Sequence, residues 1–105
     1  MEARRLFCAC DQGGLFTVDL ESGRVSHVSD LSGPPDVIFY NSRLHHLYVA
    51  IGDPGMIDVF DTDTMKLSQT VRTEVGAHTI AYNPEIGRVY AFLPASHRAA
   101  IYQEV

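Results

Sequence analysis

The chain has 105 residues, 46% of them apolar, and this length and composition are those of one ordinary globular domain. Thirteen acidic residues against eight basic ones give a net charge of −5, and the basic residues are scattered singly rather than gathered in a stripe. These features argue against nucleic-acid binding. No apolar run approaches the roughly 20 residues of a membrane helix.

An apolar motif recurs three times. LFCAC covers residues 6–10, LYVAI covers 47–51 and VYAFL covers 89–93, at intervals of 41 and 42 residues. The register continues outside the motif, since a shift of 42 residues carries Ile38 to Ile80 and Asn41 to Asn83. A period of about 40 to 45 residues with strand-like content is the spacing of a four-stranded propeller blade. No segment shows the apolar spacing of a helix.

Runs rich in Val, Ile, Phe and Tyr, separated by turn clusters, predict ten strands. In chain order they cover residues 5–10, 15–20 and 24–28, then 37–40, 44–51, 56–61 and 66–72, then 79–82, 88–93 and 99–103. We expect an all-β fold of about two and a half β-propeller blades, which are four-stranded antiparallel meanders. The expected organisation is a single partial propeller domain over residues 1–105, with an incomplete blade at 1–31, a complete blade at 32–73 and an incomplete blade at 74–105.

Several of these strands are apolar on both faces, as in LFCAC and VYAFL. An antiparallel sheet with one wet face would alternate apolar and polar residues instead. These strands must therefore be covered on both sides, which stacked blades achieve.

The LYVA motif, followed by an apolar run that ends in Asp, resembles the YVTN-type β-propeller repeat, and the resemblance extends over the whole chain. The segments GAHTIAYNP and VYAFLPASHRAAIY are similar to the carboxy-terminal blades of such propellers. The resemblance implies a ring of more blades than this chain supplies, in which an amino-terminal strand completes the last blade. It also implies a relation to WD-repeat-like proteins and to propeller lactonases.

Candidate site residues come from the loops that open on one rim of a propeller. The loops entering the inner strands contribute Asp36 and His78, and the next set of loops contributes Asp53, His97 and Arg98. Together they predict a site for a metal, or for an anionic or sugar-like ligand. Each residue has a structural alternative, because Asp and His also cap turns and Arg pairs with nearby acids.

Other reactive residues favour structural roles. Cys8 and Cys10 occupy the positions of Val49 and Ile51 in the next repeat, so we expect small apolar side chains rather than a disulfide or a metal pair. His45 and His46 are adjacent on the opposite rim and point to opposite sides, so they cannot readily share an ion. Ser96 directly precedes His97, which is poor geometry for a nucleophile and its base.

The sequence thus predicts a non-catalytic propeller-repeat module that requires no cofactor and acts in assembly or in ligand or partner binding. Its expected partners are the remaining blades of a propeller or a second copy of the chain, because terminal blades present apolar faces and unpaired edges. The alternative, which the resemblance implies, is a fragment of a lactonase-like hydrolase with a divalent metal or small-molecule site at the rim, for which Asp36, Asp53, His78 and His97 are the candidates. The chain as written has no signal segment, which predicts a cytoplasmic protein; a truncated amino terminus would leave a periplasmic or extracytoplasmic location open.

Overall fold

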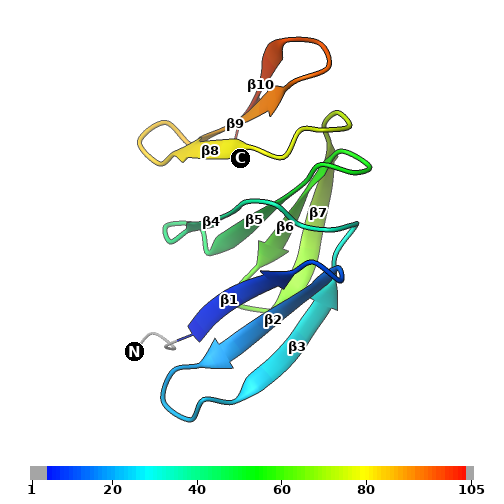
Figure 1. Cartoon of the computed structure of the whole chain (residues 1–105). Coiled ribbons are helices and arrows are strands. Elements are labelled where there is room, and N and C mark those ends of the chain that lie inside the picture. Colours follow the sequence, from blue (N-terminus) through cyan, green and yellow to red (C-terminus); the bar gives the residue numbers. More distant parts are fainter. Residues whose placement is uncertain (1–4, 104–105) are drawn as a thin grey trace.

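Ten strands form three antiparallel sheets in the computed structural model, which describes residues 5–103 (Figure 1). The first sheet has the order β1 (Arg5–Cys10), β2 (Gly14–Asp19) and β3 (Val25–Asp30). The middle sheet has the order β4 (Ile38–Asn41), β5 (His46–Ile51), β6 (Met56–Asp61) and β7 (Lys66–Arg72). In the third sheet, β9 (Arg88–Leu93) lies between β8 (Ile80–Asn83) and β10 (Arg98–Gln103). The fold is therefore a partial β-propeller, as predicted.

Most strand limits agree with the prediction to within one residue, and the largest differences lie at β3 and β5. The predicted strand 44–51 begins only at His46. Its first residues belong to a turn, because Asn41 Oδ1 accepts the backbone N–H groups of Arg43 and Leu44, and His45 has a φ of +56°. The predicted strand 24–28 begins at Val25 and extends to Asp30, which pairs with Gly14 of β2. Within residues 5–103 no helix is long and apolar enough to span a lipid bilayer.

The three sheets stack face to face, so that the middle sheet is covered on both sides (Figure 1). Leu47, Val49 and Ile51 of β5 pack with Leu15 of the first sheet. Tyr48 and Ala50, which alternate with them, pack with residues of the third sheet: Ile80, Val89 and Ala91. The prediction that strands apolar on both faces are covered on both sides is confirmed for β5. In residues 5–103, β1 and β9, the two strands on which it was based, are covered only on the face toward the middle sheet, and Leu6 and Phe92 are exposed.

Short polar turns close the hairpins in register with the repeat. Asp19 Oδ1 accepts the backbone N–H of Glu21 at 2.9 Å, and Asp61 Oδ1, in the equivalent position, accepts that of Asp63 at 2.8 Å. The N–H of Glu21 donating to Asp19 lowers the pKa of that carboxyl below its usual range. Asp19 and Asp61, which end β2 and β6, are therefore turn-forming residues at equivalent positions of the repeat.

Candidate functional site

The predicted rim exists, because the connections between sheets lie against the hairpins that join β1 to β2 and β5 to β6. The backbone N–H of Leu31 donates to Gly13 O at 2.7 Å, and that of Thr73 donates to Gly55 O at 2.8 Å. The N–H of Gly76 donates to Gly52 O at 2.6 Å. The two sets of loops that carry the candidate site residues therefore meet at one end of the sheets.

Asp36 and His78 converge at this rim on Gly52. Asp36 Oδ2 accepts the backbone N–H of Gly52 at 3.2 Å. A Cβ built on Gly52 would lie 3.1 Å from that oxygen and 3.2 Å from His78 Cβ, so the glycine lets both residues approach. His78 Nδ1 lies 3.2 Å from Thr79 Oγ1, and both site residues are exposed. An exposed carboxylate and an imidazole thus share one small region.

Asp53, His97 and Arg98 are also exposed on the hairpins of this rim. Arg98 Nε donates to Ser96 Oγ at 3.2 Å rather than to a candidate ligand group. Throughout residues 5–103, no hydrogen bond or ion pair joins any two of the five predicted residues. No group of three His, Cys, Asp or Glu side chains in this part of the chain is arranged to hold a metal ion. The rim offers separate polar groups and one convergent pair.

Two carboxylates not identified from the sequence tether the connections between sheets. The backbone N–H and hydroxyl of Ser32 donate to the two oxygens of Asp58 at 2.8 Å and 2.7 Å, and Thr70 donates to the same carboxylate at 3.2 Å. Asp58 is buried in β6. The backbone N–H and hydroxyl of Ser96 donate to the two oxygens of Glu74 at 3.0 Å and 2.7 Å.

The 42-residue repeat of the sequence gives one indication of these tethers. Glu74 lies 42 residues after Ser32, so both tethers involve equivalent positions of the inter-sheet connection, with donor and acceptor exchanged. The hydroxyl and N–H of Ser96, aided by the charge of Arg98, lower the pKa of the Glu74 carboxyl below its usual range. Each tether places a charge-assisted pair of hydrogen bonds between an inter-sheet connection and the sheet that follows it.

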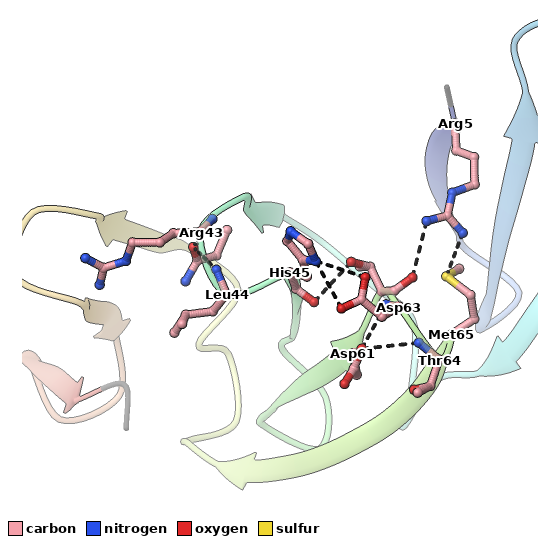
Figure 2. Close-up of polar contacts among 10 residues, drawn as sticks. Arg5, Arg43, Leu44, His45, Asp61, Asp63, Thr64 and Met65 are labelled. Atoms are coloured by element: carbon pink, nitrogen blue, oxygen red, sulfur yellow. Dashed lines mark hydrogen bonds and ion pairs between the residues drawn. The ribbon is translucent and has the colours of Figure 1, made fainter. Parts of the chain in front are cut away.

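The opposite end of the molecule carries a separate set of polar contacts (Figure 2). Arg5 of β1 donates to Thr62 O at 3.2 Å and contacts Met65 Sδ at 3.0 Å, which ties the first sheet to the β6–β7 hairpin. His45 Nδ1 lies 2.9 Å from Asp63 Oδ1. The ring of His46 lies edge-on to that of Tyr48.

The outer face of the first sheet is apolar and open. Leu6, Cys8 and Cys10 lie on it, because Phe7 and Ala9 point to the middle sheet. Leu6 is 52% exposed, whereas Leu47, its equivalent in the middle sheet, is 1% exposed. Cys8 and Cys10 are half-buried free thiols in the positions of the fully buried Val49 and Ile51.

The outer face of the third sheet is open in the same way. Phe92 is 52% exposed where its equivalent Ala50 is fully buried. Ile101 is 58% exposed where its equivalent Val59 is 7% exposed. Positions that the middle sheet buries between neighbours are therefore solvent-exposed at both ends of the stack.

Two strand edges are also open by comparison with the complete middle sheet. In residues 5–103 no strand pairs with β1 on the side where β4 pairs with β5, and none pairs with β10 on the side where β7 pairs with β6. A cavity of about 340 Å³ lies between the middle and third sheets, and Val71 of β7 and Tyr102 of β10 line it. Burial beside this cavity raises the pKa of the Tyr102 hydroxyl. The cavity marks the place where the third sheet lacks an outer strand.

Comparison with known proteins supports the fold. No family model matches the sequence, and no curated protein matches it. A chain of Kuenenia stuttgartiensis hydrazine synthase is similar in structure, with a TM-score of 0.73 and 14% identity over 93% of this chain and 38% of that chain. A chain of the mitotic checkpoint complex is similar with a TM-score of 0.61 and 15% identity, over 85% of this chain and 26% of that one. The chain thus spans well under half of either, and both contain β-propellers.

Proposed function

We propose that this chain is a non-catalytic β-propeller repeat module, of the YVTN type, that functions as part of a larger propeller by packing further blades on its two outer faces. The observation that carries the proposal is the contrast between equivalent positions. Leu47 and Ala50 are buried in the middle sheet, whereas Leu6 and Phe92 are exposed. Burial of apolar area contributes about 25 cal/mol per Å², so covering these faces favours association.

The blade divisions 1–31, 32–73 and 74–105 belong to the same proposal. The similar structures support a module within a larger protein, because this chain matches only 38% of the hydrazine synthase chain and 26% of the checkpoint chain. Two kinds of occupant fit apolar blade faces: the remaining blades of a propeller, or the face of a second copy.

Sedimentation of the purified chain with an apolar fluorescent dye tests the module proposal. We expect dye binding and association that increases with concentration, because both outer faces are apolar. Changing Phe92 and Ile101 to Ser should reduce both signals, whereas the same change at the exposed Val75, on the connection between β7 and β8, should not. A monomer that binds no dye would contradict the proposal.

The hydrolase alternative rests on the convergence of Asp36 and His78 at Gly52. It requires a metal, so it predicts saturable heat when the chain is titrated with Ca²⁺, Mn²⁺ or Zn²⁺. Our proposal predicts no saturable heat, because a carboxylate and an imidazole supply only two of the four or more ligands these ions take. Heat that disappears in the double variant Asp36→Ala, His78→Ala would favour the hydrolase.

A further inference from the structure

A specific polar and aromatic contact joins the middle sheet to the third sheet. Asn41 Nδ2 donates to the hydroxyl of Tyr82 at 2.7 Å and lies 3.4 Å from that of Tyr48, while the rings of Tyr48 and Tyr82 are 5.6 Å apart. Asn41 and Tyr48 are buried, so this amide has exchanged water for tyrosine hydroxyls. We call Asn41, Tyr48 and Tyr82 the asparagine–tyrosine lock.

Half of the same lock is present between the first and middle sheets. Phe7 is the equivalent of Tyr48 and Tyr40 is the equivalent of Tyr82, and their rings lie 5.9 Å apart in a similar tilted arrangement. The asparagine would come from an inner strand paired with β1, and residues 5–103 contain no such strand. Tyr40 is exposed where the lock is incomplete.

The other half is present on the outer face of the third sheet. Asn83 is the equivalent of Asn41, and its Oδ1 accepts the backbone N–H of Glu85 at 3.0 Å, as Asn41 Oδ1 accepts that of Arg43. Tyr90 is the equivalent of Tyr48. To be complete, this half needs a tyrosine on the innermost strand of the following blade. Tyr40 in β4 and Tyr82 in β8 occupy that position in their own sheets.

In residues 5–103, the first sheet of a second copy carries no tyrosine in the position that this half requires. In the described residues this sheet begins with β1, the equivalent of β5 and β9, and so contains no innermost strand. Residues 1–4 contain no tyrosine. We therefore propose that the partner of the third sheet is a β-propeller blade from a polypeptide segment outside this sequence, whose own innermost strand carries a tyrosine that accepts from Asn83 and packs on Tyr90. This inference rests on the proposed function and chooses between its two occupants.

Grafting an innermost strand onto the full chain tests the proposal. A copy of residues 32–41 is placed directly before Met1, so that four residues separate its asparagine from β1, as four separate Asn41 from β5. Each grafted chain then presents the missing tyrosine to the third sheet of another copy. We expect its association, measured by sedimentation, to tighten by at least about tenfold relative to the unmodified chain.

The matched control is the same graft with its tyrosine and asparagine both changed to Ala. It keeps the strand hydrogen bonds and should lose the gain, as should Asn83→Ala in the grafted chain. If the unmodified chain forms a saturating dimer as tightly as the grafted one, or if the Ala graft works equally well, this inference is wrong while the module proposal stands. A dye-negative monomer would contradict the module proposal itself.

A measurement without the graft guards against misfolding of the fusion. In the unmodified chain, Asn83→Ala and Tyr90→Phe should leave the weak association unchanged, because no lock partner is present in another copy. Loss of association in either variant would show that copies already complete the lock, and would overturn the inference.

Discussion

At the residue scale, the repeat includes the backbone conformation of the hairpin turns. Among residues 5–103, three non-glycine residues have a left-handed φ, and each occupies a position that is glycine in another repeat. His97 (φ +55°) is equivalent to Gly55 (φ +102°), and His45 (φ +56°) is equivalent to Gly87 (φ +63°). Met65 likewise corresponds to Gly23. A side chain at a left-handed position costs about 1 to 2 kcal/mol.

We predict that His97→Gly stabilises the chain. The side chain of His97 is exposed to solvent. Glycine relieves the left-handed backbone conformation, and this gain in stability exceeds the loss caused by the greater freedom of glycine in the unfolded chain. We expect the free energy of unfolding to rise by about 0.5 to 1 kcal/mol. Urea unfolding measures the change. His97→Ala is the control, since it keeps the Cβ and should show no gain; equal stabilisation by Ala would contradict the backbone explanation.

At the element scale, serine–carboxylate tethers hold each inter-sheet connection to the sheet that follows it, in addition to the apolar packing between sheets. Ser32 binds the buried Asp58, and Ser96 binds Glu74 at the more exposed rim. Because Asp58 also accepts from Thr70, its carboxylate fixes both a connection and an outer strand. These contacts fix the path of each connection against the sheet that follows it.

The Glu74 tether predicts a pH dependence. The pKa of Glu74 is lowered in the folded chain, chiefly by the Ser96 hydroxyl, so its contribution to stability is complete above the ordinary pKa of a glutamate and is lost as the pH falls through the lower folded value. Ser96→Ala should therefore destabilise the chain most at neutral pH, and the difference from the original chain should shrink in acid. Urea midpoints at several pH values measure this.

Glu74→Gln provides the control for that titration, because its side chain has no proton to gain. In the Glu74→Gln background, Ser96→Ala should have an effect that does not vary with pH over the same range. A pH-dependent effect in that background would assign the titration to another group.

At the scale of the whole molecule, residues 5–103 form a stack of three sheets (Figure 1) with exposed apolar side chains at each end, and each terminal sheet has three strands where the middle sheet has four. Compared with the middle sheet, the described part of the first sheet has no inner strand and that of the third has no outer strand. In the assembly that we propose, the added blades supply their own strands at both ends.

The reactivity of Cys8 and Cys10 measures whether a further blade packs on the outer face of the first sheet. Both thiols lie on its outer face and are half-buried, so we predict that they react with a thiol reagent in the isolated chain and become protected when a further blade packs there. The double variant Cys8→Val, Cys10→Ile, which copies Val49 and Ile51, should preserve that association, whereas Cys8→Asp should weaken it. Thiols that stay reactive in the assembly would place the interface elsewhere.

The sequence predicted the fold well where the repeat compared three similar segments. The motif at Leu47 fixed the middle sheet, and a strand apolar on both faces required neighbours on both sides. The sequence also placed Asp36 and His78 on one rim, but not their convergence on Gly52, which depends on two loops that are distant in the chain. The start of β5 was misjudged because the turn made by Asn41 extends to His45.

The sequence by itself determined the strands, their order and the equivalence of positions between blades, because these follow from local alternation and a fixed period. Only the tertiary structure decided which equivalent positions are buried, and which asparagine meets which tyrosine. Those properties arise from contacts between sheets that the chain reaches some 40 residues apart, as Asn41 reaches Tyr82. They therefore depend on how the sheets stack rather than on the pattern within any one strand.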